Sequence, residues 1–201
     1  MVREKINIPV NVLIVPTGGD FVYTNIEFEA MKQDILLCKQ LGFNGVVLGI
    51  LLVDGSIDIE RTTELVKLAF PLEVTFHRAF DRCVDAYKGL EAIISCGCKR
   101  LLTSGQQADV VAGKHLLQKL VNLANNRLII LPGGGVNSSN ILNLKTTTNA
   151  VEFHASCKKT IPTSMVYIND SMNDNNNETS VDIKEITLVK QLLNTLLPKN
   201  S

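Results

Sequence analysis

The chain has 201 residues, 45% of them hydrophobic, and its 20 Lys and Arg residues balance its 20 Asp and Glu residues. That size and apolar content suffice for the core of one domain, whereas a net charge of zero disfavours nucleic acid and anionic membranes as partners. No apolar run is long enough to cross a bilayer, and the N-terminus lacks a signal-peptide pattern. Five irregularly spaced cysteines are typical of reduced thiols. The composition therefore predicts a single cytosolic domain over residues 1–201.

Apolar β-type runs alternate with amphipathic helical patterns along the chain. Residues 8–15 are predicted to form a strand, and Thr24 with Glu27 forms a capping box that begins a helix. Residues 45–50 are continuously apolar, which is typical of a strand buried on both faces in a parallel sheet. The remaining predicted elements, in chain order, are a helix capped by Asp58 and ended by Pro71, a strand that ends at Arg78, a helix over 85–95, a strand over 100–103, a helix over 109–123, a strand over 127–131, a short helix capped by Asn137, a strand over 150–153 and a final helix that begins at Asp182.

An Asn-rich segment lies between the last two of these elements. Residues 169–181 carry few apolar side chains, so burial would not offset the entropy lost on ordering them. They are predicted to form a flexible insertion.

Strict alternation of strands and helices leaves two architectures, a doubly wound sheet and a (β/α) barrel. In an open sheet the ligand contacts concentrate at one switch point, whereas in a barrel they form a ring at the strand ends. Polar or glycine-rich groups follow nearly every predicted strand, at 17–20, 77–78, 103–105, 133–135 and 154. This favours a TIM-type (β/α) barrel that is incomplete, because only about six of the eight βα units are recognisable.

The strand that ends at Arg78 is followed by a dense group of ionisable side chains. His77, Arg78 and Asp81 lie within one short segment. Alternate residues of a strand face opposite sides, so His77 and Arg78 are expected to point apart. The group either belongs to a functional site or satisfies hydrogen bonds with neighbouring loops, and the segment alone favours neither interpretation.

A small anion is one candidate ligand for these strand ends. Gly133, Gly134 and Gly135 lead from a strand to a capped helix, where exposed backbone N–H groups hold phosphate or carboxylate. Ser104 and Gly105 follow the neighbouring strand and are expected to join them.

Several ionisable side chains at the same strand ends are candidates for chemistry. Arg78 is expected to neutralise an anion, His77 or His154 to shuttle protons, and Asp81 to orient an imidazole. Glu152 is expected to act together with His154, because the two share one strand face. No nucleophile–base pair or metal triad is recognisable, so no catalytic residue and no reaction is assigned. One alternative is an enzyme that acts on a small phosphorylated or carboxylated metabolite. The other alternative is that these side chains only form hydrogen bonds with one another at a polar end of the barrel.

The segments Gly18-Gly19-Asp20-Phe21, Asp54-Gly55-Ser56-Ile57-Asp58, Thr75-Phe76-His77-Arg78-Ala79-Phe80-Asp81, Leu102-Thr103-Ser104-Gly105-Gln106, Pro132-Gly133-Gly134-Gly135-Val136 and Glu152-Phe153-His154 occur in this order. Together they resemble the CutC copper-homeostasis family over about residues 8–156. The resemblance implies a TIM-type barrel, a role in copper tolerance with Cu(I) as a ligand, and a cytoplasmic or nuclear location, with no settled enzymatic reaction. In the family register the loop 133–135 follows strand seven, where such barrels commonly bind phosphate.

Two features depart from the family pattern. The family's first two strands, which carry cysteines proposed as copper ligands, have no counterpart in this sequence. Val15-Pro16-Thr17 stands where the family usually has Arg-Pro-Arg, which removes two cations from the strand-end ring.

Copper would need ligands from the cysteines that remain. Cu(I) prefers thiolates and accepts imidazole. Cys83 follows one strand and Cys157 follows His154, so these three side chains are the candidate Cu(I) ligands. Cys96 and Cys98 straddle a helix end and a strand start, on the opposite face of a barrel, and are expected to be structural.

A third interpretation is a shortened chain that has lost its function. Without two strands, the strands around Val12 and Val151 would be unpaired edges, which favour aggregation or strand exchange with another copy. Three alternatives therefore stay open: a copper-homeostasis protein, an enzyme for a small anion, and a non-functional isoform. A copper ion, a small molecule and a second copy of the chain are the expected partners.

Overall fold

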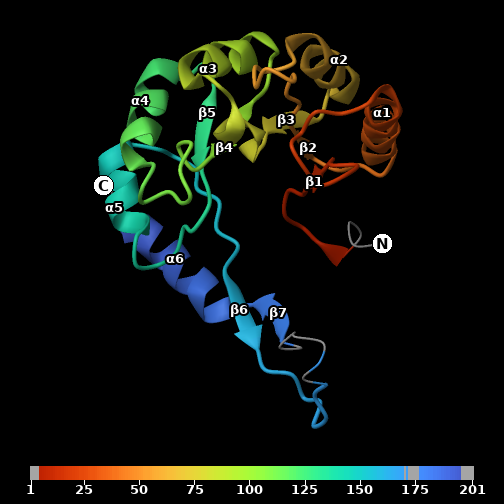
Figure 1. The fold of residues 1–201 in the computed structure, drawn as a ribbon. Coiled ribbons are helices and arrows are strands. Elements are labelled where there is room, and N and C mark those ends of the chain that lie inside the picture. The colour runs from red at the N-terminus through yellow and green to blue at the C-terminus, as the bar shows by residue number, and fades with distance from the viewer. Residues whose placement is uncertain (1–4, 170, 172–176, 196–201) are drawn as a thin grey trace.

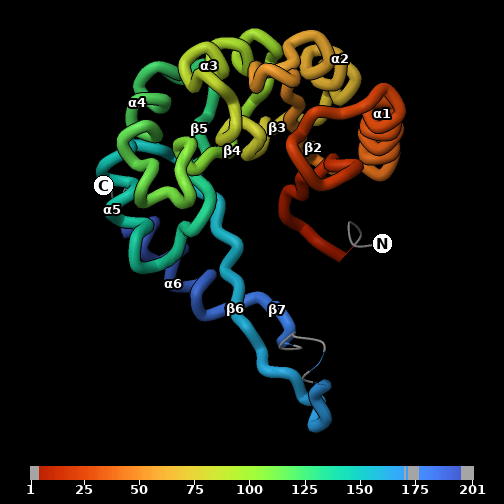
Figure 2. Tube along the Cα trace, viewed as in Figure 1, coloured from red at the N-terminus to blue at the C-terminus, as the bar shows by residue number. Residues whose placement is uncertain are grey.

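The computed structural model describes residues 5–169, 171 and 177–195, and a parallel five-stranded sheet lies at its centre (Figure 1). Neighbouring strands in the sheet are also consecutive in the chain: β1 (Asn11–Leu13), β2 (Gly45–Leu48), β3 (Glu73–Phe76), β4 (Arg100–Thr103) and β5 (Ile129–Pro132). One helix follows each strand on the outer side of the curved sheet: α1 (Asn25–Gln40), α2 (Ile59–Ala69), α3 (Ala86–Ser95), α4 (Lys114–Ala124) and α5 (Ile141–Thr148) (Figures 1 and 2). This confirms the predicted βα alternation.

Local capping begins the first three helices where the sequence predicted. Thr24 accepts a hydrogen bond from the Glu27 amide, and the Glu27 carboxylate accepts one from the Thr24 amide at 2.8 Å. Asp58 caps α2 and Asp85 caps α3 through two amides, those of Tyr87 and Lys88. Each cap satisfies backbone donors that the first turn of a helix leaves without partners.

The two faces of the sheet differ in how well they are covered. On the outer face Val74, Phe76 and Leu101 are at most 2% exposed, as expected for a parallel sheet covered by helices. On the inner face Leu13 is 63% exposed. Within the described residues β1 pairs only with β2, and β5 pairs with β4 and through one isolated bridge with His154. The fold is therefore an incomplete TIM-type barrel whose described strands do not close into a ring.

The strand predicted over residues 150–153 is wrong. The segment forms no ladder with the sheet, and the residue after it, His154, makes one bridge to Gly133, where the His154 amide donates to the Pro132 carbonyl at 2.9 Å. Glu152 is drawn instead to Arg100, which contacts it through two nitrogens at 2.6 and 3.2 Å. A side-chain contact across the sheet thus replaces the regular ladder that a strand would need.

Two predicted helices start later than expected, because a turn held by an Asp or Asn side chain precedes each of them. The prediction began one helix at residue 109, whereas α4 begins at Lys114. The Asp109 carboxylate accepts from the amides of Val111 and Ala112, which makes a turn before the helix, and the Val110 amide donates to the Gly134 carbonyl at 2.9 Å. Asn137 was expected to cap the next helix, but Asn140 precedes α5, and the Asn137 side chain turns the loop by accepting from the Ser139 amide.

The C-terminal part forms an antiparallel hairpin and a final helix. Strand β6 (Lys158–Ile161) pairs with β7 (Glu178–Val181), and α6 (Ile183–Thr195) follows. The helix packs against α5, and its Glu185 carboxylate accepts hydrogen bonds from the amide and the hydroxyl of Ser138 (Figure 1). The sequence predicted no structure for 178–181, whereas these residues form β7. Most of the rest of the Asn-rich segment, residues 170 and 172–176, lies outside the described residues.

No helix in the described part of the chain is both long and apolar enough to cross a membrane.

Candidate functional site

The carboxylate of Asp81 organises the carboxyl end of the sheet. Asp81 lies in the short 3-10 helix η2 (Arg78–Arg82), which follows β3, and its side chain is 9% exposed. It accepts hydrogen bonds from the Thr103 hydroxyl, from the amides of Ser104 and Gln106, each at 3.1 Å, and from Arg78 Nε at 2.6 Å. With both oxygens taken up by these donors, Asp81 acts as an anchor between η2 and the loop after β4.

Arg78 is held in one orientation by this anchor. Besides the ion pair with Asp81, its Nη2 donates to the Ser104 hydroxyl at 2.8 Å. The side chain is 42% exposed, and Nη1 has no partner among the described residues. A Cβ atom at Gly134 would lie 3.2 Å from both Cζ and Nη1, and Gly134 has a φ of 111°. The guanidinium therefore lies directly against the glycine loop, in a space that only glycine leaves open.

A pocket of about 460 Å³ opens beside this guanidinium. Its lining comes from three loops and consists of Phe21, Arg78, Asp81, Arg82, Gln106, Gln107 and Ala108. Arg82 donates to the Gly19 carbonyl at 2.6 Å and lies 5.1 Å from the Phe21 ring centre, so it joins the loop after β1 to η2. The guanidinium groups of Arg78 and Arg82 both line the pocket, and the Asp81 carboxylate beside them already accepts from internal donors. The pocket is consequently suited to an anion.

The five predicted anion-binding residues fall into two groups: some hold the loops together, and others have backbone groups that are not used in this way. Ser104 holds Arg78 and Asp81, the Gly105 amide donates to the Thr103 hydroxyl at 2.9 Å, and the Gly133 amide donates to the Thr103 carbonyl. These three residues therefore shape the loops. Gly134 lies against Arg78, while no described residue accepts a hydrogen bond from the Gly135 amide. Of the five, Gly134 is the one that lies against the Arg78 guanidinium, whereas Gly135 lines a separate hollow with Cys157 and Glu185.

His77 is buried on the opposite side of the strand end from Arg78, as the alternation predicted. It is 5% exposed, its ring centre lies 4.8 Å from that of Phe21, and a Cβ at Gly49 would overlap it. Burial lowers the pKa of His77 from 6.5 to about 4. Nδ1 accepts from the Ala79 amide at 3.1 Å, which places the proton on Nε2, an atom without a partner. The prediction that His77 shuttles protons near neutral pH is therefore not supported.

Glu152 and His154 do not form a common site. The Glu152 carboxylate is taken up by Arg100 at the start of β4, and Arg100 also contacts Glu73 at the start of β3. His154 lies at the other end of β5, beside Gly133, and desolvation lowers its pKa. The two side chains thus belong to opposite ends of the sheet.

The three predicted copper ligands lie in different surroundings. Cys83 is buried beside Gln106, whose Nε2 is 3.3 Å from the sulfur, and burial raises the pKa of this thiol to about 11. Cys157 lies near Asp182 and Glu185, and its pKa is also raised, mainly by desolvation. Within the described ranges no three His, Cys, Asp or Glu side chains are grouped to hold a metal ion. Cys83, His154 and Cys157 are thus not gathered into one such group there.

Sequence reasoning missed several lining residues of the pocket, above all Phe21, Arg82 and Gln106. Gly18-Gly19-Asp20-Phe21 and Gln106 belong to motifs recognised in the sequence, but nothing local indicates that Arg82 reaches Gly19. A signal did exist for Arg82, which follows Arg78 by one turn of a short helix.

Parallel strands, outer helices and an anion-suited pocket at the carboxyl end of the strands define this protein as a TIM-barrel type of (β/α) protein. The model of the CutC family matches residues 1–159. A CutC family protein from Chromobacterium violaceum is 45% identical over 83% of this chain and 68% of its own length. The copper homeostasis protein cutC homolog of Mus musculus is 38% identical over 96% of this chain and 72% of its own length.

A solved structure agrees with these relatives. The putative copper homeostasis protein CutC from Streptococcus agalactiae is 33% identical and superposes with a TM-score of 0.71, covering 75% of this chain and 74% of that protein. The chain belongs to the CutC family.

Proposed function

We propose that this CutC-family protein serves in copper homeostasis, and that it binds a small carboxylated or phosphorylated molecule in the pocket of Arg78 and Arg82. The role in copper homeostasis rests on the names of its relatives. The proposed ligand rests on one observation: the Arg78 guanidinium is fixed by Asp81 and Ser104 while its Nη1 points to no protein acceptor.

Fixing the guanidinium in advance favours binding. An Arg side chain that is free in solution loses rotamer freedom when it binds an anion, and here Asp81 and Ser104 have already restricted it. A hydrogen bond from a guanidinium to carboxylate or phosphate is charge-assisted and stronger than a neutral one. Arg82 adds a second positive charge on the pocket wall, where the Gly19 carbonyl positions it.

The proposal is limited to binding and assigns no reaction. His77, the imidazole closest in sequence, has its Nδ1 occupied and stays neutral at pH 7. Asp81 has spent both oxygens on internal donors and is a positioning residue for Arg78.

Calorimetric titration with inorganic phosphate and with malonate tests this proposal. The variants are Arg78→Met and Arg82→Met, and Arg127→Met is the matched control. Arg127 is 45% exposed, close to the 42% of Arg78, and pairs with Glu91 on α3, away from the pocket. Arg78→Met is expected to weaken binding about tenfold or more, as for loss of a charge-assisted hydrogen bond. Equal affinities in Arg78→Met and Arg127→Met would contradict it.

Direct Cu(I) binding by Cys83, His154 and Cys157 is a separate prediction. It is supported by the ligand preferences of Cu(I) and by the copper role in the names of relatives. Titration with Cu(I) against a competing chelator, before and after Cys83→Ser and Cys157→Ser, tests it. Cys38→Ser is the control, since Cys38 is buried in the core on α1. Unchanged affinity in both test variants would end this proposal.

A further inference from the structure

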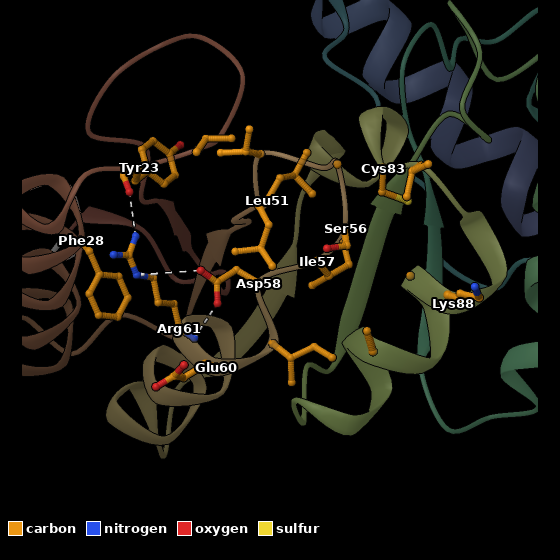
Figure 3. A pocket seen from close by; sticks show the side chains of 18 of the residues that line it. Tyr23, Phe28, Leu51, Ser56, Ile57, Asp58, Glu60, Arg61, Cys83 and Lys88 are labelled. Atoms are coloured by element: carbon orange, nitrogen blue, oxygen red, sulfur yellow. Dashed lines mark hydrogen bonds and ion pairs between the residues drawn. The ribbon is translucent and has the colours of Figure 1, made fainter.

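Three of the five arginines in the described part of the chain use every side-chain nitrogen in contacts within the protein. One of them is Arg61, which lies beside the hollow between α2 and α3 (Figure 3). Its Nη1 donates to the Tyr23 carbonyl at 2.7 Å, its Nη2 donates to Asn25, and its Nε lies 3.8 Å from Asp58. The other two are Arg100 and Arg127. All three guanidiniums are therefore fully engaged inside the protein.

Arg78 and Arg82 are the two exceptions, and both line the same pocket of about 460 Å³. Among the described residues no acceptor contacts Nη1 of Arg78, and none contacts Nε or Nη2 of Arg82. Arg82 also pairs with no described carboxylate, whereas each of the other four arginines does. Unused donors and an uncompensated positive charge are thus gathered in one pocket.

The two guanidiniums are anchored on opposite sides of strand β3. Both come from η2, which follows β3, and the sheet order places β1 and β2 on one side of β3 and β4 on the other. Arg78 donates to the Ser104 hydroxyl in the loop after β4, whereas Arg82 donates to the Gly19 carbonyl in the loop after β1. The pocket therefore contains two cationic groups that different loops hold in place.

Each guanidinium keeps a different set of nitrogens for a ligand. In Arg78 the edge formed by Nε and Nη2 is occupied by Asp81 and Ser104, so Nη1 is the nitrogen that remains. In Arg82 the same edge is free within the described structure. Because an Nε–Nη2 edge matches the two oxygens of a carboxylate, Arg82 is suited to an acidic group of its own, separate from the one at Arg78.

The rest of the lining suits an uncharged spacer between two acidic groups. Asp81 is the acidic residue in the lining, and its carboxylate already accepts from internal donors. Gln106 is held in place because its Nε2 donates to the Cys83 carbonyl at 2.7 Å. Gln107 and Ala108 are exposed and uncharged. A ligand with two acidic groups therefore meets no unpaired carboxylate in this lining.

We propose that the ligand of the Arg78 pocket is a small molecule with two acidic groups, one bound by Arg78 and the other by Arg82, joined by a short uncharged spacer. This inference rests on the proposed function and narrows its ligand class to dicarboxylates and phosphorylated carboxylates. A volume of about 460 Å³ is that of a small-molecule site. Because the two groups are linked, the second binds at a high effective concentration once the first is bound, so the whole molecule binds more tightly than either group alone.

Calorimetric titration of the wild-type chain with malonate, succinate and glutarate, each beside its own monomethyl ester, tests the inference. The ester keeps the spacer and loses one acidic group. At least one dicarboxylate is expected to bind about tenfold or more tightly than its ester, as for one additional charge-assisted hydrogen bond. An advantage below about tenfold for all three dicarboxylates overturns the inference.

Variants show whether each arginine binds its own acidic group. Arg78→Met and Arg82→Met are each expected to reduce the advantage of the dicarboxylate to about twofold, the statistical factor for two equivalent carboxylates that share one remaining site. Arg127→Met, which removes an arginine paired with Glu91 away from the pocket, is expected to keep the wild-type advantage. A full advantage in Arg82→Met shows that the second group is not bound there and overturns the inference.

The outcomes distinguish this inference from the proposed function. If Arg78→Met weakens phosphate binding but dicarboxylates and esters bind the wild type equally, the proposed function stands and the inference fails. If the wild type binds neither phosphate nor any dicarboxylate, both fail. Because the comparison of ligands uses the wild-type chain, it still decides the matter if circular dichroism shows that a variant is unfolded.

Discussion

Acidification should destabilise this protein through His77 in a narrow pH window. The folded protein keeps the buried ring neutral, with a pKa of about 4, whereas the unfolded chain takes up a proton near pH 6.5. Between these values the unfolded state binds more protons, so stability falls as the pH is lowered from 6.5 towards 4 and is fully present above 6.5. The difference in pKa corresponds to about 3 kcal/mol of unfolding free energy.

Urea denaturation at a series of pH values between 7 and 4 measures this loss. Carboxylates also titrate in this range, so the quantity of interest is the difference between the wild type and His77→Asn. An Asn side chain has an oxygen that can accept from the Ala79 amide as Nδ1 does, but it does not titrate. The variant should lose about 3 kcal/mol less than the wild type on acidification. Equal losses in the two proteins would refute the reasoning.

Proton NMR gives a direct reading of the same group. The chain has three histidines, and the His77 signal is the one that His77→Asn removes. Phe21→Ala should raise the pKa of His77 towards 6.5, because the Phe21 ring packs against the imidazole at 4.8 Å and excludes water. A His77 signal that already titrates near 6.5 in the wild type would show that the ring is not desolvated.

Two further predictions concern the Arg78 anchor. Gly134→Ala should cost roughly 1–3 kcal/mol of stability and weaken phosphate binding, because φ is 111° and the new methyl group would lie 3.2 Å from the Arg78 guanidinium. Gly18→Ala, in open space, is its control and should change stability by less than about 0.5 kcal/mol in chemical denaturation. Asp81→Ala should cost about 1–3 kcal/mol in the same assay, because it leaves the amides of Ser104 and Gln106 without an acceptor; a loss below 1 kcal/mol would show that Asp81 does not anchor the loops.

The elements predicted correctly are those whose stabilising contacts are local. A capping residue and its amides lie within three positions, as for Asp85 with Tyr87 and Lys88, so the pattern is complete in the sequence. Buried parallel strands such as β2 are also legible, because both faces demand apolar residues.

The errors occurred where a distant partner competes with local preference. The segment 109–113 has helical periodicity, but it forms a turn around the Asp109 carboxylate, and its Val110 amide joins it to the Gly134 carbonyl. Residues 178–181 have few apolar side chains and were assigned no structure, but pairing with β6 orders them as β7. The partners of β7 lie in β6, as Thr160 does for Thr179, and no local pattern records such a pairing.

The sequence by itself determined the βα alternation, the family and the end of the sheet at which polar groups gather, because each depends on periodicity or on short motifs. Only the tertiary structure decided which of those groups share a pocket. Arg78 and Ser104 are 26 positions apart and Arg82 and Gly19 are 63 apart, yet each pair is joined by a hydrogen bond. Contacts over such separations depend on how strands and loops pack in three dimensions, and so does the burial that keeps His77 neutral.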